Sequence, residues 1–225
     1  MTDISKYEYY RTENGVLYHG DCLEILPHLE PVDLVLTDPP YGIKRDKGFG
    51  GFGGFGTPIK RREHDDCWDS TRPNKEVFDL ILSIGGLCLI SGGNYFADIL
   101  PQSTHWIVWD KKNTMPSFGD AELIWSNSGR KSVKIITYEY NGLIGKEKHR
   151  YHPTQKPVGL FVLLTDKYSE QTHTILDPFL GSGTTAVACE RLGRKWIGIE
   201  LEEKYCEIAA KRIEAENRQL KIPGC

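Results

Sequence analysis

The stretch from Thr37 to Ile43 reads TDPPYGI and places reactive groups directly after an apolar run. Asp38 is an acceptor-only carboxylate when ionised, and the backbone carbonyl of Pro39 is a second acceptor. Pro39 and Pro40 have fixed φ angles and no N–H, so this carbonyl can be held rigidly. Two acceptors aimed at one amino group would draw its hydrogens out of the ring plane and localise the nitrogen lone pair. The pattern therefore suits an exocyclic amine that becomes a nucleophile.

Tyr41 completes this group of candidate catalytic residues, which are Asp38, Pro39, Pro40 and Tyr41. Its ring offers a face on which a planar base can stack, an interaction worth about 1–3 kcal/mol in nucleic-acid complexes. An amine on a flat ring would thus be held both at its nitrogen and at its face.

A second stretch, His173 to Glu200, has the pattern of a nucleotide-binding turn. A predicted strand ends at Asp177, the glycine turn Gly181–Gly183 follows, and a predicted helix comes next. Glycines let backbone N–H groups approach a ligand, and a helix N-terminus adds partial positive charge. Glu200 ends the following strand and can accept both hydroxyls of a ribose. Because the sequence lacks the G-x-G-x-x-G spacing and a Walker lysine, adenosine without phosphates fits at least as well as a dinucleotide.

The elements that must position these residues alternate between strand and helix. Apolar, β-branched runs predict seven strands, near 15–20, 32–37, 86–91, 105–110, 121–126, 174–177 and 196–200. Helical spacing of apolar residues predicts helices within 73–86, 157–170, 183–194 and 202–220. This alternation indicates an α/β fold with a mostly parallel sheet and helices on both faces.

Two features of the predicted sheet bear on function. The strands 105–110 and 121–126 have no link of helix length between them, so we expect one of them to run antiparallel. In open sheets of this kind, ligands bind beyond the carboxyl ends of the strands. We therefore expect Asp38 and Asp177, which both lie at such ends, to face one cleft.

Charge is distributed unevenly along the 225 residues, whose net charge is −3. Residues 44–62 contain six Lys or Arg against one acid, and residues 130–156 contain seven against two. Each segment carries +5, so the rest of the chain carries −13. An acidic body with two basic segments can attract a polyanion, although solvated lysine-rich loops would give the same pattern. The candidate residues for contact with such a polyanion are Lys44, Arg45, Lys47, Lys60, Arg61, Arg62, Arg130, Lys131, Lys148 and Arg150.

Two segments do not fit the predicted sheet. The Gly-rich basic segment at about 44–70 is expected to form a mobile loop, because ordering glycine-rich chain costs much entropy. The short basic segment at about 127–151 is expected to contact the polyanion, with a hairpin that turns at Asn141-Gly142. We expect residues 1–225 to form a single domain that carries both segments.

The sequence also argues against several other classes of protein. No apolar run approaches the ~18 residues of a membrane span, and the first residues contain no apolar targeting segment. The six cysteines are scattered without a C-x-x-C pair, which is typical of reduced thiols in a cytoplasmic protein. Two pairs of candidate ligands, His149 with His152 and His64 with Cys67, lack matching partner pairs, so no metal site is expected.

Three motifs carry a resemblance to a known family, namely DPPY (38–41), HPTQKP (152–157) and DPFLGSGTT (177–185). In this order they resemble the signatures of β-class S-adenosylmethionine-dependent DNA amino-methyltransferases, which occur in restriction–modification systems, among cell-cycle methylases and in phages. The similarity spans about residues 15 to 210. It implies a Rossmann-like methyltransferase fold, S-adenosyl-L-methionine as cofactor and double-stranded DNA as substrate.

The resemblance also implies a role for each matched residue. The DPPY motif would form the target-amine site, the glycine turn would surround the methionine and sulfonium part of the cofactor, and Glu200 would bind its ribose. The GDC at 20–22 matches the strand end that contacts the cofactor adenine, so Asp21 is a candidate for its N6 amine. HPTQKP would lie beside the methionyl carboxylate. The candidate cofactor-binding residues are Asp21, Cys22, Thr154, Gln155, Lys156, Asp177, Phe179, Gly181, Ser182, Gly183, Thr184, Thr185 and Glu200.

The motifs favour adenine N6 as the target but leave alternatives open. The same acceptor pair fits cytosine N4, although the family's cytosine members usually have serine in place of Asp38. Methylation of a protein glutamine or an RNA base usually goes with asparagine there. A non-catalytic DNA-binding or regulatory module would be expected to have a broken motif, and none is broken.

The recognition region is shorter than in family members that read long sites, because only residues 127–151 are available for it. We therefore expect a short or relaxed recognition site. A homodimer is the alternative source of DNA contacts.

Overall fold

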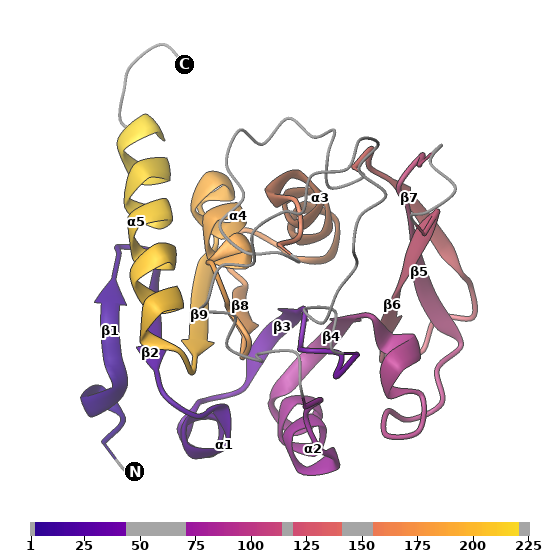
Figure 1. Cartoon of the computed structure of the whole chain (residues 1–225), viewed down its shortest axis with the longest axis horizontal. Helices are drawn as coiled ribbons and strands as arrows, with labels where there is room; N and C mark the ends of the chain where they lie inside the picture. The colour runs from indigo at the N-terminus through magenta and orange to yellow at the C-terminus, as the bar shows by residue number, and fades with distance from the viewer. Residues whose placement is uncertain (1–2, 44–70, 114–118, 141–154, 221–225) are drawn as a thin grey trace, which may run out of the picture.

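The computed structural model describes residues 3–43, 71–113, 119–140 and 155–220, and these build a nine-stranded sheet between two layers of helices (Figure 1). The strands are β1 (Glu8–Arg11), β2 (Gly15–His19), β3 (Val32–Thr37), β4 (Gly85–Ser91), β5 (His105–Asp110), β6 (Ala121–Ser126), β7 (Lys134–Thr137), β8 (Thr174–Asp177) and β9 (Lys195–Glu200). The α-helices are α1 (Cys22–Ile25), α2 (Lys75–Ile84), α3 (Val158–Tyr168), α4 (Thr184–Leu192) and α5 (Glu203–Leu220), and 3₁₀ turns cover Ser5–Tyr7, Leu26–His28 and Gly93–Phe96.

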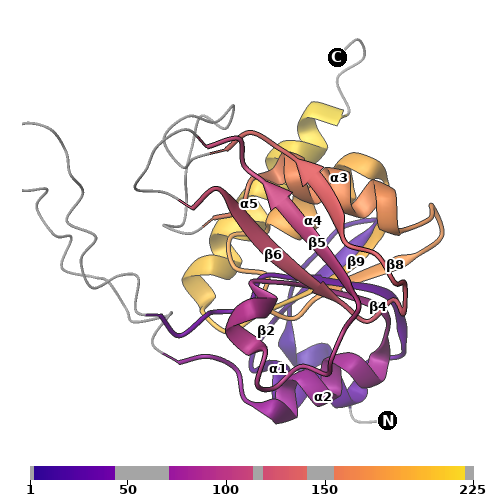
Figure 2. The same cartoon turned by 90° about the vertical axis from the view of Figure 1, so that its right-hand side faces the viewer.

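Helices α3, α4 and α5 cover one face of the sheet, and α1 and α2 cover the other, as the two views show (Figures 1 and 2). Alternate residues of β3 point to opposite faces. Leu34 and Leu36 belong to the apolar cluster that includes Phe161 of α3. Val35 belongs to the cluster that includes Phe78 of α2. The predicted α/β architecture with helices on both faces is confirmed.

The sheet has nine strands instead of the predicted seven, in the order β1-β2-β9-β8-β3-β4-β6-β5-β7. The two additional strands, β1 and β7, lie at the two edges and have four residues each. They are mostly exposed or half-buried, so neither gives the long apolar run by which the other strands were recognised. β7 falls within the second basic segment and pairs in parallel with β5.

Two strands of this sheet run against the others, where one was predicted. β6 is antiparallel to both β4 and β5, as expected from the short link between β5 and β6. β1 is antiparallel to β2 and was not foreseen, because β1 itself was not. The reversal of β6 matters for the site, since the first residues of β6 lie at the edge where β4 and β5 end.

The predicted helices begin and end close to their expected positions. Asn74 caps α2 by accepting a hydrogen bond from the backbone N–H of Val77. Gly183 precedes α4 with a φ of 88°, and Gly193 follows it with a φ of 62°, a conformation that favours glycine. The helix ends are therefore defined by local residues, as the sequence indicated.

The direction of the crossover connections places a cleft between β3 and β8. These strands are neighbours, with Leu34 opposite Ile175 and Val35 opposite Leu176. α2 follows β3 and α4 follows β8 along the chain, and the two helices cover opposite faces. At such a switch point the loops after the two strands separate, and ligands bind there.

Several predicted features fall outside the described residues. They are the Gly-rich segment 44–70, the Asn141-Gly142 turn, and the pairs His64 with Cys67 and His149 with His152. Within the described ranges, no group of three or more His, Cys, Asp or Glu side chains is arranged to hold a metal ion. No helix in those ranges is long and apolar enough to cross a membrane.

Candidate active site

Four adjacent strands, β2, β9, β8 and β3, are each followed by or end in an acidic residue at one edge of the sheet. These residues are Asp21, Glu200, Asp177 and Asp38. They line one cavity of about 430 Å³, a size within the ~300–1,000 Å³ typical of small-molecule sites. The sequence prediction that Asp38 and Asp177 face one cleft agrees with this arrangement.

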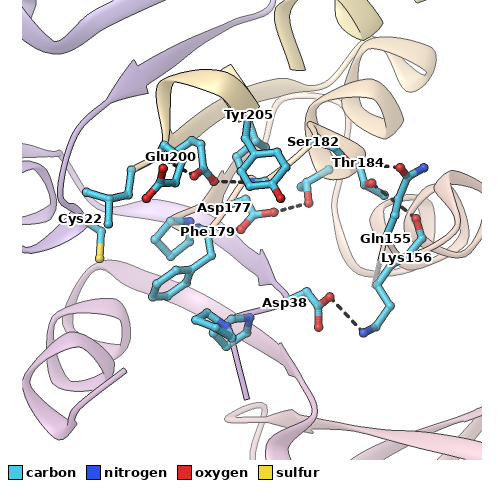
Figure 3. A pocket seen from close by; sticks show the side chains of 18 of the residues that line it. Cys22, Asp38, Gln155, Lys156, Asp177, Phe179, Ser182, Thr184, Glu200 and Tyr205 are labelled. Carbon is cyan, nitrogen blue, oxygen red and sulfur yellow. Dashed lines mark hydrogen bonds and ion pairs between the residues drawn. The ribbon is translucent and has the colours of Figure 1, made fainter. Parts of the chain in front are cut away.

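The cavity brings together most of the predicted site residues (Figure 3). Of the candidates, it is lined by Asp21, Cys22, Asp38, Pro39, Pro40, Tyr41, Gln155, Lys156, Asp177, Phe179, Gly181, Ser182, Thr184, Thr185 and Glu200. Gly183 does not line it, and Thr154 lies outside the described residues. The lining also contains residues that sequence reasoning did not select, among them Thr71, Phe161, Leu201 and Tyr205.

Asp177 is held by three hydrogen bonds at the start of the glycine turn. Its Oδ1 accepts from the Thr37 hydroxyl at 2.7 Å and from the Phe179 N–H at 3.0 Å. Its Oδ2 accepts from the Thr185 hydroxyl at 2.5 Å. Burial raises the pKa of Asp177 to about 6, although these hydrogen bonds lower it. The carboxyl group therefore organises the turn and ties it to β3.

Glu200 supports the same turn from the neighbouring strand. Its Oε2 accepts from the Gly181 N–H at 2.8 Å, and its Oε1 accepts from the Glu202 N–H at 2.8 Å. Burial raises its pKa, and these backbone hydrogen bonds oppose that rise. Each carboxylate oxygen can accept a second hydrogen bond, so both remain suited to ligand hydroxyls.

Helix α5 packs behind the glycine turn and fixes its shape. A side chain at Gly183 would place a Cβ 3.0 Å from the Cβ of Ala209, closer than most side chains pack. Arg212 Nη1 donates to the Ser182 carbonyl at 2.5 Å and to its hydroxyl at 2.8 Å. Gly183 thus serves the close approach of α5, which explains its place behind the cavity wall.

At the same end of the cavity as Glu200, Asp21 and Cys22 begin helix α1. Asp21 caps this helix by accepting from the Leu23 N–H at 2.9 Å. Burial raises the pKa of Cys22 to about 12, so its thiol stays protonated at neutral pH. In the close view, Cys22 and Glu200 lie toward one end of the site, and Asp38 and Lys156 lie toward the other (Figure 3).

The DPPY motif holds Asp38 through Tyr41. The Tyr41 hydroxyl donates to Asp38 Oδ1 at 2.5 Å, and burial raises the pKa of Asp38. The Tyr41 ring stacks on Tyr95 with centroids 4.6 Å apart. Gly92 makes room for the ring, since a Cβ there would lie 2.3 Å from Tyr41 Cε1. Tyr95 covers one face of Tyr41, so a base could stack only on the opposite face.

Lys156 reaches the target-amine end of the cavity. Its Nζ lies 3.0 Å from Asp38 Oδ2, 3.0 Å from the Tyr41 hydroxyl and 3.2 Å from Glu122 Oε2. The lysine was predicted to lie beside the methionyl carboxylate, but its ammonium contacts the DPPY motif (Figure 3). Its backbone still accepts a hydrogen bond from the Thr184 hydroxyl at 3.4 Å, so it bridges both parts of the site.

Sequence reasoning missed Glu122 and its second partner, Lys111. Lys111 Nζ lies 2.5 Å from Glu122 Oε1, and both side chains are largely buried. Lys111 follows β5 and Glu122 is the second residue of β6, which runs the opposite way. An acid at the start of a reversed strand lies at the same edge as acids at the ends of parallel strands. The short link between β5 and β6, which predicted the reversal, was therefore the signal that could have located Glu122.

The described DNA-contacting candidates lie away from this cavity. Arg130 and Lys131 follow the end of β6, and the Arg130 carbonyl accepts a hydrogen bond from Thr104, just before the start of β5. That edge of the sheet is opposite to the one that carries Asp38, because β6 is antiparallel to β4. Their position argues against contact with DNA at the cavity. The other candidates, Lys44, Arg45, Lys47, Lys60, Arg61, Arg62, Lys148 and Arg150, lie outside the described residues.

The cavity fits an adenosine-type cofactor with a charged tail. Glu200 offers carboxylate oxygens for hydroxyl groups, and Phe179 and Leu201 add apolar walls. Beyond them, Ser182 and Thr184 at the start of α4 offer hydroxyl and backbone donors for an anionic group. The residues present therefore fit S-adenosylmethionine.

Comparison with known proteins supports this interpretation. A family model described as DNA methylase, which covers N6 and N4 methylases, matches residues 120–211. The chain is 29% identical to the type II methyltransferase M2.LlaDCHI of Lactococcus lactis subsp. cremoris, over 91% of each chain. It is 28% identical to M2.DpnII of Streptococcus pneumoniae, over 93% of each chain.

Solved structures share the fold. The M1.HpyAVI–SAM complex matches with a TM-score of 0.57 and 24% identity, over 88% of this chain and 98% of the other. The cytosine-N4-specific PvuII DNA methyltransferase matches with a TM-score of 0.62 and 18% identity, over 96% and 94%.

Proposed function

We propose that this chain, which is similar to DNA methylases, is a β-class S-adenosylmethionine-dependent methyltransferase that methylates the exocyclic N6 amine of adenine in DNA. One observation carries the proposal above the others. The intact DPPY motif and the glycine turn with Glu200 line the same cavity, at the ends of adjacent strands.

Bound S-adenosylmethionine supplies a methyl group on a positively charged sulfur. We assign Glu200 to the ribose of the cofactor, because its carboxylate lies at the end of the cavity away from Asp38 (Figure 3). We assign the start of α4 to the methionine part, because Ser182 and Thr184 line the cavity along the glycine turn. Asp21, which caps α1 beside Cys22, is assigned to the adenine amine. This assignment leaves the Asp38 end of the cavity for the target amine.

Asp38 and the Pro39 carbonyl accept hydrogen bonds from the target amine. The Asp38 carboxylate is fixed by Tyr41 and Lys156, and each of its oxygens keeps a further lone pair for the amine. On transfer, the amine nitrogen would take up the methyl group, the electrons of the S–C bond would stay on the sulfur, and the amine would gain positive charge before losing one proton to solvent. A carboxylate in a largely buried site stabilises that developing charge.

Adenine inside a duplex cannot reach this cavity, so the base must leave the stack. Base flipping of this kind costs a few kcal/mol and is cheapest at a mismatched or unpaired base. We assign the face of the Tyr41 ring opposite Tyr95 as the surface on which the flipped base stacks. Replacing the pairing partner of the target adenine should accordingly tighten DNA binding.

The test is a product analysis. The protein is incubated with labelled S-adenosylmethionine and unmethylated DNA, and the DNA is digested to nucleosides. Label in N6-methyladenine is the expected result. Label in N4-methylcytosine would transfer the proposal to cytosine, and label found only with an RNA or protein substrate would reject DNA as the substrate. No label with any of these would leave a non-catalytic DNA-binding module.

A further inference from the structure

Lys156 is shared between two carboxylates at the target-amine end of the cavity. Its ammonium lies 3.0 Å from Asp38 Oδ2 and 3.2 Å from Glu122 Oε2, and its side chain is only 8% exposed. A lysine buried to this extent needs a compensating negative charge. Here two are present, so Asp38 does not hold the lysine alone.

Glu122 is itself shared between two lysines. Lys111 Nζ lies 2.5 Å from Glu122 Oε1, and the two side chains are 15% and 20% exposed. The other oxygen, Oε2, faces Lys156 but has no hydrogen bond of normal geometry within the described residues. The order of contacts is therefore Asp38, Lys156, Glu122 and Lys111, with charges that alternate in sign.

The alternation governs how strongly Lys156 neutralises Asp38. A carboxylate that is fully paired with an ammonium is a poorer acceptor for a third group. Glu122 competes with Asp38 for the hydrogen bonds and the electrostatic attraction of the Lys156 ammonium. Lys111 weakens this competition, because it pairs with Glu122 as well. The two residues thus act on Asp38 in opposite directions through a common partner.

We propose that Glu122 and Lys111 are positioning residues that set the acceptor strength of Asp38 by controlling its contact with Lys156. This inference rests on the proposed function, in which Asp38 accepts a hydrogen bond from the target amine. Neither Glu122 nor Lys111 lines the cavity, so their action is indirect.

The pKa shifts of Asp38 and Glu122 have the directions that this proposal requires. Burial raises the pKa of Asp38, Lys156 and the Tyr41 hydroxyl lower it, and Glu122 raises it again. Burial raises the pKa of Glu122, but Lys156 and Lys111 outweigh it and bring that pKa to about 2. Glu122 is therefore ionised throughout the working pH range. Asp177, the remaining acid that faces Asp38, is common to every variant compared below.

Two variants and two controls test the proposal through the pH dependence of kcat. Glu122→Gln keeps the size of the side chain and removes its charge. Lys156 should then move closer to Asp38, so the plateau of kcat falls several-fold and its acid limb moves to lower pH, by about half a unit to one unit. Lys111→Gln leaves Glu122 with only Lys156, so the acid limb should move to higher pH.

Lys112→Gln is the matched control. It removes the same charge one residue along the chain, where the exposed lysine pairs with the half-buried Asp110 instead. Its acid limb should coincide with that of the unaltered protein. Glu122→Asp, which retains the charge, should restore the acid limb of the unaltered protein even if the rate stays lower.

The pKa of Asp38 can also be followed without turnover, by carbon NMR of the labelled carboxyl groups in each folded variant. Opposite shifts for Glu122→Gln and Lys111→Gln support the proposal. Equal shifts, no shift, or a shift equal to that of Lys112→Gln would overturn it. If Glu122→Gln does not fold, the direction of the Lys111→Gln shift still decides the matter. Absence of methylated adenine with the unaltered protein would reject the proposed function instead, and the NMR result would stand apart from it.

Discussion

The Thr37 hydroxyl donates a 2.7 Å hydrogen bond to Asp177 Oδ1 and so joins the last residues of β3 and β8. Both groups are buried. β3 leads into Asp38, and β8 leads into the glycine turn. This bond therefore links the target-amine motif directly to the cofactor turn, at the point where a methyl group and an amine must be aligned.

Replacing Thr37 with valine should disturb that alignment. Valine keeps the shape of the side chain and removes the donor, so Asp177 Oδ1 retains only the Phe179 N–H. Because misplacement of a reacting group by about 1 Å can cost 10²-fold in rate, we expect kcat to fall at least about tenfold. Steady-state assays with saturating cofactor would measure it. Thr137→Val, which removes an exposed hydroxyl from β7, is the control and should leave kcat unchanged.

Asp177→Asn should change how stability depends on pH. Burial raises the pKa of Asp177 from 3.8 to about 6, so between these values the folded protein binds a proton that the unfolded chain does not. The stability that the neutral carboxyl contributes is complete below pH 4 and is lost as the pH rises through 6. The change amounts to roughly 3 kcal/mol, at ~1.4 kcal/mol per pKa unit.

Urea unfolding at a series of pH values would measure this difference. The free energy of unfolding of the unaltered protein minus that of Asp177→Asn should decrease between pH 4 and 6. The exposed Asp79 on α2, replaced in the same way, provides the comparison. Parallel curves for the unaltered protein and Asp177→Asn would show that the pKa of this carboxyl does not change on folding.

Asp38→Asn should abolish methyl transfer and leave cofactor binding nearly intact. The amide lacks the charge that stabilises the developing positive amine, and losses of about 10²–10³ in rate are typical for such groups. Transfer of labelled methyl groups to DNA and calorimetric titration with S-adenosylmethionine would be measured on the same sample. Turnover close to that of the unaltered protein would contradict the assignment of Asp38.

Glu200→Gln should raise the KM for the cofactor and leave kcat nearly unchanged, the opposite of the result expected for Asp38→Asn. One amide hydrogen would face the N–H of Gly181 or Glu202, so the turn loses a hydrogen bond and a ribose acceptor. Hydrogen bonds to charged groups contribute about 1.5–3 kcal/mol, which corresponds to a rise in KM for the cofactor of roughly 10- to 100-fold. We expect kcat at saturating cofactor to change little. A loss confined to kcat would place Glu200 in the chemistry rather than in binding.

Much of the fold followed from the sequence because its strands are long, apolar and bounded by turns. Where a strand such as β7 had only four residues, three of them exposed, no local pattern distinguished it from a loop. The common location of the acids Asp38, Asp177 and Glu200 could also be predicted from the sequence, because the ends of parallel strands meet at one edge.

The contacts of Lys156 could not be predicted from the sequence in this way. Its motif indicated the cofactor, whereas its side chain reaches Asp38 and Glu122. Predicting this requires the order of strands across the sheet, in which β6 lies between β4 and β5 and runs the other way. That order depends on contacts between distant segments and leaves no periodic trace in the sequence.

The central place of β3 between β4 and β8 also has a consequence for synthesis on the ribosome. The residues joined by the Thr37–Asp177 bond are 140 positions apart, so at about 5–20 residues per second β8 is made roughly 7–28 s after β3. During that interval one edge of β3 has no partner, and its apolar side chains can pair with another nascent chain. We therefore expect the yield of native protein to depend on translation speed and on chaperones that shield this edge until β8 emerges.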